Sequence, residues 1–298
     1  MNLLEQIRKL LKDPPPEYAF EVSETAIAWA RRTRQDLKLG VEALEPGVIA
    51  VSPLRDNVAD PDAFFRHVKA LAGGNGASRR RRAALILPDF CARVAVLDFD
   101  QFPSDAAEQA SLVRFRMKKS IPFDVDSAQV SYYVQSRGGA GRRFEVVAAV
   151  APLEIIARYE AAFRSAGFEP GLVTTSTLAA LNLLKPGGVQ VLARLSGTVL
   201  TAAVTEGRNL RLLRCVELPE FTAEEVMRVL FPTCAFVEDT LGEKPRELLV
   251  CGFGDWEPVV VEQSRQDLGL EVRRLGSRFG EPGPANAGLL GFLEAAEV

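Results

Sequence analysis

With 298 residues, 47% of them hydrophobic and 25% charged, the chain has the length of two domains or one large domain and a globular composition. Its net charge of −3 argues against an overall attraction to nucleic acid, and a single histidine with four scattered cysteines leaves almost no ligands for a zinc site. Cysteines without CxxC spacing indicate a reducing cytoplasm, and no apolar stretch reaches the roughly 18 residues that cross a bilayer.

The N-terminal residues 1–12 have the apolar spacing of one helical face, and the proline run 14–16 ends the predicted helix. We expect this helix to dock on its own protein or on a partner. The alternative is a short helix in the membrane interface, because Arg8, Lys9 and Lys12 fill its polar face.

The next part of the chain is predicted to hold three strands, a helix and a strand. The ranges are 18–30 for a hairpin that turns near Ser23 and Glu24, 37–44 and 48–51 for short strands, 60–73 for a helix, and 83–87 for a buried strand. Four arginines at 79–82 precede that strand. They are typical of a solvated loop, and a contact with acidic lipid or a phosphate-rich partner is the alternative.

A different unit follows, with the order strand, helix, strand, strand, helix. The ranges are 93–99, 104–117 with Ser104 as the helix cap, 129–135, 144–150 after a glycine-rich turn at 138–141, and 152–166. Its size is that of an α+β module inserted into a larger domain, at about 93–167.

The last third of the chain repeats the pattern of the first. After a strand at 172–174 and a helix at 176–184, strands are predicted at 189–195, 199–205, 210–216, 247–251 and 271–273, with helices from Thr222, at 258–268 and at 285–296. Two such units joined near Gly187 form an internal structural repeat. The repeat predicts an α/β, actin-like (ribonuclease H-like) fold of duplicated domains at 17–186 and 187–298, after an N-terminal helix and linker at 1–16.

Two predicted hairpins, 20–27 and 191–200, lie where an actin-like ATPase holds Mg-ATP. Each place expects Asp-x-Gly, because Gly lets backbone N–H groups approach phosphate and Asp organises the metal with its waters. Here the acid positions hold Glu21 and Arg194, and the glycine positions hold Ser23 and Ser196. An arginine opposes a metal cation, although it could pair with a phosphate. The mismatch favours binding over hydrolysis.

Three segments carry a family resemblance. They are 116–124 with Ile-Pro-Phe at 121–123, Ala149-Val150-Ala151-Pro152-Leu153 followed by Ala166-Gly167-Phe168-Glu169-Pro170, and Thr177-Leu178-Ala179. In order and spacing they resemble the type IV pilus assembly protein family PilM, and the resemblance runs from about Phe20 to Leu293.

The resemblance implies an actin-like fold with a module inserted in the first domain. It also implies a place at the cytoplasmic face of the inner membrane, peripheral to it, and normally ATP binding. The partner that it implies is the N-terminal cytoplasmic segment of a PilN-like membrane protein, held in a groove between the module and its parent domain.

The chain departs from this family at three further places. The family's third Asp corresponds to Thr174, and its glycine-rich adenosine loop is reduced to Gly252 and Gly254, which are more typical of a tight turn. Between Leu218 and Glu247 only about one helix fits, around 223–230, where the family has a helical subdomain that closes over the nucleotide. We therefore expect no catalytic residue, metal or cofactor, with Mg-ATP as the disfavoured alternative.

The partner groove is the family function that does not depend on the missing acids. Its candidate residues are Phe90, Arg114, Phe115, Arg116, Ile121 and Phe123. Ile121 and Phe123 could instead fill the core of the module. Arg114 and Arg116 are expected to be free for an acidic or polar flank, so that replacing both should leave stability nearly unchanged.

The leading hypothesis is a non-catalytic scaffold of a type IV pilus-like assembly platform that binds the cytoplasmic tail of a membrane partner, with a cytoplasmic pilus ATPase as a further partner. One alternative is an ATP-binding actin-like ATPase in which Glu21 or Glu24 holds Mg²⁺. Another is the cytoplasmic domain of a type II secretion platform protein, which would be expected to precede a membrane span. The sequence leaves open which machine the chain serves and its oligomeric state.

Overall fold

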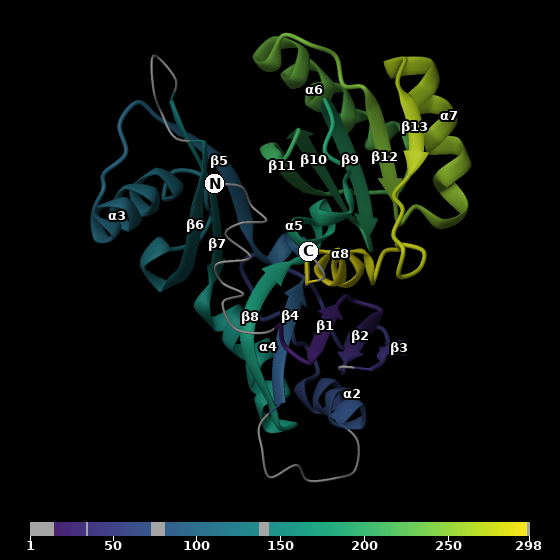
Figure 1. Ribbon diagram of the computed structural model, residues 1–298. Helices are drawn as coiled ribbons and strands as arrows, with labels where there is room; N and C mark the ends of the chain where they lie inside the picture. The colour runs from purple at the N-terminus through teal and green to yellow at the C-terminus, as the bar shows by residue number, and fades with distance from the viewer. Residues whose placement is uncertain (1–14, 34, 73–80, 137–142, 297–298) are drawn as a thin grey trace.

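The computed structural model describes residues 15–33, 35–72, 81–136 and 143–296 (Figure 1). The predicted N-terminal helix, Arg79, Arg80 and the turn at 138–141 lie outside these residues. The strands are β1 Tyr18–Val22, β2 Ala26–Arg32, β3 Leu37–Ala43, β4 Arg81–Leu87, β5 Arg93–Phe99, β6 Ala128–Ser136, β7 Phe144–Pro152, β8 Phe168–Thr175, β9 Val189–Ser196, β10 Val199–Glu206, β11 Asn209–Glu217, β12 Glu247–Cys251 and β13 Glu271–Arg274. The helices are α2 Pro61–Ala72, α3 Ala106–Met117, α4 Leu153–Ser165, α5 Ser176–Ala180, α6 Ala223–Leu241, α7 Glu257–Leu268 and α8 Ala287–Ala296.

Two sheets of five strands have the same topology. The first sheet has the order β3-β2-β1-β4-β8 and the second β11-β10-β9-β12-β13. In each, an antiparallel meander of three strands is followed by two strands that lie parallel to its first strand. The predicted internal repeat is therefore confirmed. The expected strand at 48–51 is wrong, because only an isolated bridge joins Ile49 to Val58.

The central strands are apolar along their length because both faces of their sheets are covered. In the second sheet, α6 and α7 cover one face, where Val191 and Val250 lie in a core with Val226 and Val260. On the opposite face, α5 and the following segment pack with α8, which runs between the two sheets (Figure 1).

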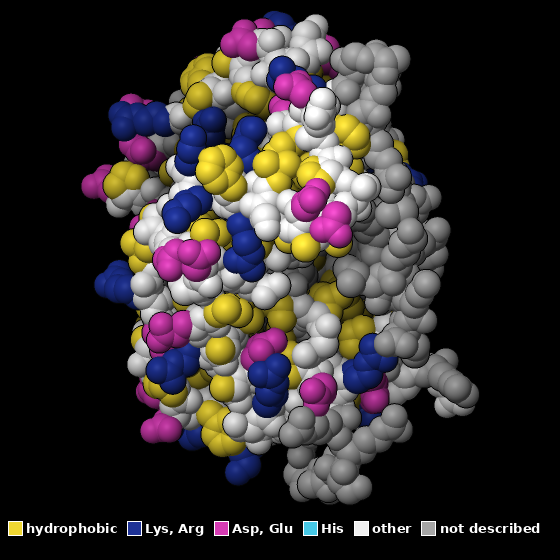
Figure 2. Space-filling model, turned by 90° about the vertical axis from the view of Figure 1, so that its left-hand side faces the viewer, with side chains coloured by type: hydrophobic (Ala, Val, Ile, Leu, Met, Phe, Trp, Pro, Cys, Tyr) yellow, Lys and Arg dark blue, Asp and Glu magenta, His cyan; other side chains and the backbone are white. Residues whose placement is uncertain are grey.

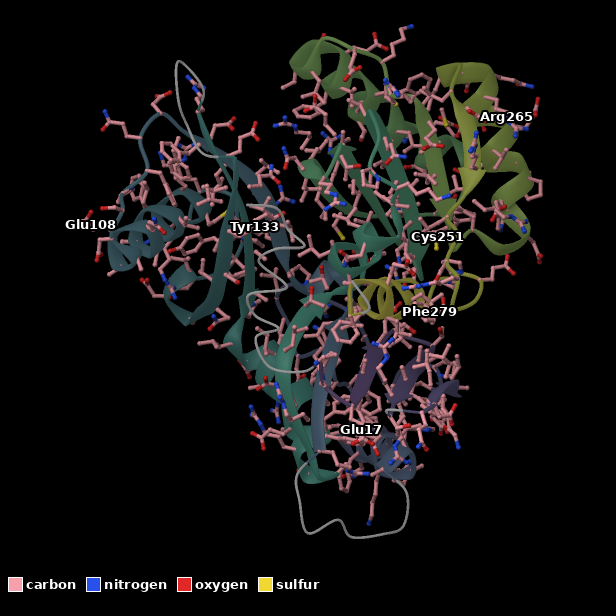
Figure 3. The ribbon with its side chains drawn as sticks, in the orientation of Figure 1. Glu17, Glu108, Tyr133, Cys251, Arg265 and Phe279 are labelled. Atoms are coloured by element: carbon pink, nitrogen blue, oxygen red, sulfur yellow. The ribbon has the colours of Figure 1, made fainter. Side chains whose placement is uncertain are left out.

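A third sheet, β5-β7-β6, stands apart from the first two and is called the module sheet here (Figure 1). Helix α3 covers one of its faces through Val113 and Met117. The other face packs against the second sheet, where Val94 and Tyr133 join the cluster that contains Leu213 (Figure 3). The predicted module therefore has a sheet of its own, and it contacts the second sheet.

Helix α4 does not belong to the module, contrary to the expected β-α-β-β-α unit. Ile155, Tyr159 and Phe163 form one buried helical face. They lie in the core of the first sheet, where the ring of Phe163 is 4.8 Å from that of Phe20. Chain order placed α4 after the module strands, but its apolar face is complementary to a sheet formed by distant residues.

Two helix boundaries also differ from prediction. Asp105, rather than Ser104, caps α3, because its carboxylate accepts hydrogen bonds from the N–H groups of Ala107 and Glu108. Between β11 and β12 there is one helix, as expected, but α6 continues through Pro232 to Leu241.

Candidate functional site

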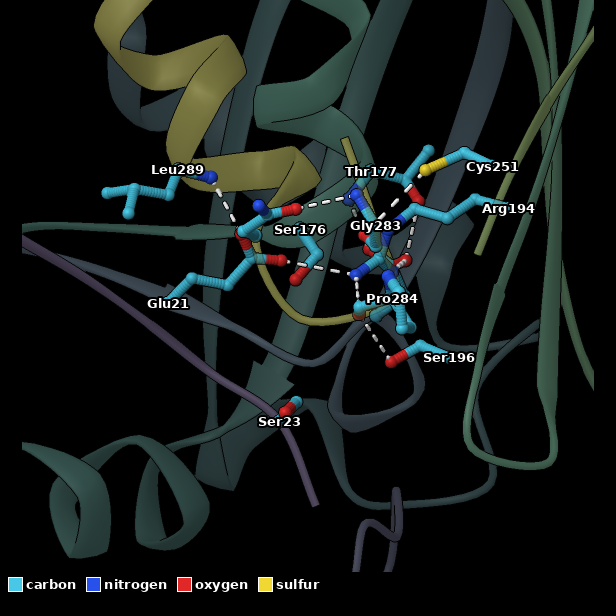
Figure 4. A network of polar contacts seen from close by, with 12 residues as sticks. Glu21, Ser23, Ser176, Thr177, Arg194, Ser196, Cys251, Gly283, Pro284 and Leu289 are labelled. Atoms are coloured by element: carbon cyan, nitrogen blue, oxygen red, sulfur yellow. Dashed lines mark hydrogen bonds and ion pairs between the residues drawn. The ribbon is translucent and has the colours of Figure 1, made fainter. Parts of the chain in front are cut away.

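The predicted nucleotide positions meet in a buried ion network between the first and second sheets (Figure 4). Arg194, on β9, is 2% exposed and is among the largest fully buried side chains. Its guanidinium donates to Glu21 Oε1 on β1 at 3.1 Å, to Asp89 Oδ2 at 3.1 Å and to the Pro284 carbonyl at 2.8 Å. From the sequence, Arg194 was expected to repel a metal. In the structure, Arg194 is itself the cation of the site.

Asp89 is the site residue that the sequence analysis missed. It follows the carboxyl end of β4 in a short 3₁₀ turn and is 6% exposed. Besides Arg194, its carboxylate accepts from the Thr177 N–H at 2.7 Å, the Thr177 hydroxyl at 2.5 Å and the Thr201 hydroxyl at 3.1 Å. An acid directly after a predicted buried strand could have been noticed, because functional groups gather at the carboxyl ends of parallel strands.

Glu21 completes the network. It is fully buried, and its second oxygen accepts a hydrogen bond from the Leu289 N–H of α8 at 2.7 Å. Burial raises the pKa of Glu21, and the charge of Arg194 opposes that rise. Burial by itself would lower the pKa of Arg194, but the charges of Asp89 and Glu21 outweigh it and the pKa of Arg194 is raised. The guanidinium therefore stays charged between two carboxylates.

The serines at the two predicted glycine positions form different hydrogen bonds, because Ser23 closes its own hairpin turn and Ser196 bonds to the chain after β13. The Ser23 hydroxyl accepts from the Ala26 N–H at 3.0 Å, and the Ser196 hydroxyl donates to the Pro284 carbonyl at 3.0 Å. Glu24 accepts from the Val51 N–H at 3.0 Å, and its other oxygen lies 2.6 Å from where a Cβ on Gly197 would be. The two turns thus approach each other closely, and Glu24 is engaged within the protein.

Mg-ATP, which the fold class implies, does not fit these residues. A cavity of about 20 Å³ remains between the two turns, lined by Phe90, Asp89, Arg194 and Ser196 among others. That volume has room for a single water rather than a phosphate. No cluster of three or more His, Cys, Asp or Glu that could hold a metal is found within the described part of the chain.

The remaining predicted nucleotide positions are not part of the ion network. Thr174, on β8, is half-buried and is not among the described residues that form the ion network. Gly252 has φ of 86°, and a Cβ there would lie 2.1 Å from the Leu195 carbonyl oxygen. This glycine is thus explained by the turn after β12. Gly254 begins the 3₁₀ turn that leads into α7.

The six groove candidates are distributed over different surroundings. Ile121 and Phe123 pack against the core of the module sheet, as the alternative interpretation proposed. The expectation that Arg114 is free is wrong, because its guanidinium donates to the Val125 carbonyl at 2.9 Å. Arg116 is exposed and lies over the ring of Phe99, 5.1 Å from its centroid.

Phe115 is the candidate that remains available on the module surface. It is 63% exposed, the largest value among the exposed large hydrophobic side chains of the described residues. Lys119 lies 5.8 Å from its ring centroid, and Arg116 and Lys118 beside it are exposed. Figure 2 shows hydrophobic side chains bordered by Lys and Arg on the side of the molecule that α3 occupies in Figure 1.

The duplicated sheets define an actin-like fold, in which a buried ion network occupies the predicted nucleotide positions. Among solved structures, the chain is similar to a chain of a PilM–PilN type IV pilus biogenesis complex, with a TM-score of 0.73 and 16% identity over 96% of this chain and 100% of that one. The expected PilM-like, actin-like fold is therefore confirmed. No family model and no curated protein matches the sequence.

Two further structures share the fold. A protein of actin-like ATPase fold and unknown function from Bacteroides thetaiotaomicron has a TM-score of 0.59 and 10% identity, covering 94% of this chain and 97% of that one. The cytoplasmic domain of EpsL, an inner-membrane component of the type II secretion system of Vibrio cholerae, has a TM-score of 0.53 and 13% identity, with 94% coverage of both chains. Among the helices described for this chain, none is long and apolar enough to cross a membrane.

Proposed function

We propose that the chain is a non-catalytic scaffold of a type IV pilus-like assembly platform at the cytoplasmic face of the inner membrane. The observation that carries this proposal is the Arg194 guanidinium, buried between Glu21 and Asp89 at the predicted nucleotide positions. A fixed cation does there what a metal would otherwise do, which is to neutralise acids contributed by separate strands. Hydrolysis would require a metal and a phosphate in a space that side chains fill.

The ion network gives the scaffold a ligand-independent link between its two sheets. Glu21 and Asp89 come from β1 and the end of β4, whereas Arg194 and Thr201 come from β9 and β10 of the second sheet. These groups are buried, so solvent and salt screen them little. A scaffold of this kind holds one domain arrangement without a nucleotide, which suits constant attachment to a partner.

The partner that we propose is the cytoplasmic tail of a PilN-like membrane protein, and the likeness to a PilM–PilN complex supports it. We place part of its binding surface at α3, where Phe115 offers an aromatic anchor. Arg116, Lys118 and Lys119 would accept acidic residues of the tail. A cytoplasmic pilus ATPase is a further partner of the same proposal.

Two measurements test the proposal. Calorimetric titration with Mg-ATP should give no binding in the micromolar range. Micromolar binding, or ATP turnover above background, would refute the proposal that the scaffold is non-catalytic. Pull-down of the cognate tail should weaken with Phe115→Ala. The matched control is Phe231→Ala, which replaces another exposed phenylalanine, on α6. If both variants retain the tail equally, the α3 surface is wrong.

The likeness to the EpsL cytoplasmic domain favours a second candidate, a platform protein of a type II secretion system. This second candidate would also be a scaffold, but it would bind the tail of a secretion-system protein instead of a pilus protein. Presenting the cognate pilus tail and the cognate secretion tail to the same protein, in competition, distinguishes the two machines, because the proposed function requires preference for the pilus tail.

A further inference from the structure

A larger cavity lies at the opposite end of the second sheet from the ion network. Its volume is about 690 Å³, and it shares no lining residue with the small cavity at Arg194. Gln190 and Glu247, at the starts of the parallel strands β9 and β12, line it, whereas Arg194 lies near the end of β9. The segment after α5 and the end of α8 form its other walls. The scaffold role proposed above does not involve this cavity.

The interior of the cavity is apolar, and two of its lining residues each bury a polar atom away from the open space. Leu183, Leu249 and Leu275 are among its apolar lining residues. Gln190 Oε1 and Thr205 Oγ1 are buried without a hydrogen-bond partner, and their residues are 5% and 6% exposed. Glu247 accepts a hydrogen bond from Gln190 Nε2, which leaves the Gln190 carbonyl oxygen as the acceptor. The leucine side chains therefore make the interior a place for aliphatic groups.

The rim of the cavity is basic. Its lining includes five cations and two acids, in a chain whose net charge is −3. They are Lys185, Arg208, Arg273, Arg274 and Arg278, against Glu247 and Glu294. Lys185 and Arg208 are exposed and have no ion pair with a described residue. Arg273 pairs with Glu247 and Glu271, Arg274 with Glu257 and Glu281, and Arg278 with Glu294. The side chains of these three arginines are more than half exposed, so a carboxylate ligand can compete for them.

We propose that this cavity binds a segment of a protein partner that combines aliphatic side chains with acidic ones. An aliphatic side chain would fill the leucine-lined interior, and carboxylates would meet the rim at Lys185 and Arg208. One wall is formed by β13, the outermost strand of its sheet, where an extended peptide can also form backbone hydrogen bonds. That strand edge favours a peptide over a small anionic amphiphile.

The test begins by selecting, from a display library of random linear peptides, those that bind the whole chain. Selected peptides should share aliphatic residues next to Asp or Glu. In fluorescence polarisation with the best selected peptide, the double variant Lys185→Glu/Arg208→Glu should raise Kd about tenfold or more, because two attractions become repulsions. The control Arg55→Glu/Lys69→Glu changes the net charge equally on exposed residues outside the cavity and should leave Kd unchanged.

A variant inside the cavity separates binding from folding. Leu183→Ser shortens a half-buried leucine of the lining, so the peptide should bind a few-fold more weakly, while a melting temperature close to that of the wild type shows that the variant is folded. The proposal is overturned if selected peptides lack acidic residues, if they bind the charge-reversed variant as well as the wild type, or if no peptide is selected. Stabilisation by decanoate without peptide selection would assign the cavity to a small amphiphile and refute the peptide. None of these outcomes depends on the ATP or tail measurements.

Discussion

Replacing Arg194 with Met tests whether the buried guanidinium stabilises the molecule. Methionine keeps an unbranched side chain of similar length but removes the charge and the three hydrogen bonds to Glu21, Asp89 and Pro284. Because Arg194 is 2% exposed, water cannot easily replace those bonds. Two carboxylates would then remain buried without a cation, which is more costly than the loss of the attraction itself.

The expected loss is about 3–5 kcal/mol, the usual cost of removing one partner of a buried ion pair. The two acids should not contribute equally. Asp89 would keep three bonds from Thr177 and Thr201, whereas Glu21 would keep two, from the Leu289 N–H and the Ser176 side chain. The additional change Glu21→Leu should therefore recover much of the loss, since apolar replacements of whole buried pairs are often neutral.

Urea unfolding followed by circular dichroism measures these free energies of unfolding. In a separate thermal unfolding experiment, the midpoint of Arg194→Met should fall by roughly 6–20 °C, at about 2–4 °C per kcal/mol. The control is Arg228→Met, because Arg228 is exposed and pairs with Glu224 and Glu225 on the surface, where such pairs contribute at most about 1 kcal/mol. An Arg194→Met protein as stable as the wild type would refute the role of the network, and a double variant no better than the single would refute the argument about Glu21.

Three further outcomes are expected. The hydrogen bond to Glu42 is the main reason that the pKa of His67 is raised above 6.5. The stability that protonated His67 contributes is therefore complete below that pH and is lost as pH rises through the folded pKa. In urea unfolding, His67→Gln should cost more stability at about pH 6 than at about pH 9. Arg114→Ala should cost about 1.5–3 kcal/mol through its carbonyl bonds, and Arg116→Ala within about 0.5 kcal/mol; equal costs would contradict the assignment. Burial raises the pKa of Cys251 to about 12, so iodoacetamide should leave it unmodified in native protein and alkylate it in urea, as read by mass spectrometry.

The sheets were predictable from the sequence because their patterns are local. Alternation around Ser23 and the apolar run 83–87 both became strands at the expected places, and the duplication joined near Gly187 followed from their order. The packing of α4 was not predictable in the same way. Its apolar face was visible, but the residues that it meets, including Phe20 and Phe64, lie far away in the sequence. Periodicity identifies a buried face without identifying its partner.

The site was half predictable for the same reason. Glu21 and Arg194 could be identified because a known pattern of residues was broken at their positions. Their interaction could not, since they are 173 positions apart, and Arg194 is 105 positions from Asp89. A single arginine appears repulsive toward a metal when its neighbours are unknown. Once two acids are known to surround it, the same charge becomes the stabilising one.

The changed positions of the site depend on one another. Glu21 reaches Arg194, and the Ser196 hydroxyl shares the Pro284 carbonyl with that guanidinium. A carboxylate at position 194 would therefore not recreate a metal site by itself. It would join Glu21 and Asp89 as a third buried acid, in a cavity of about 20 Å³ with no room for a hydrated cation. The residues that fill the predicted nucleotide positions are thus the same ones that link the two sheets, and exchanging one of them does not create a metal site.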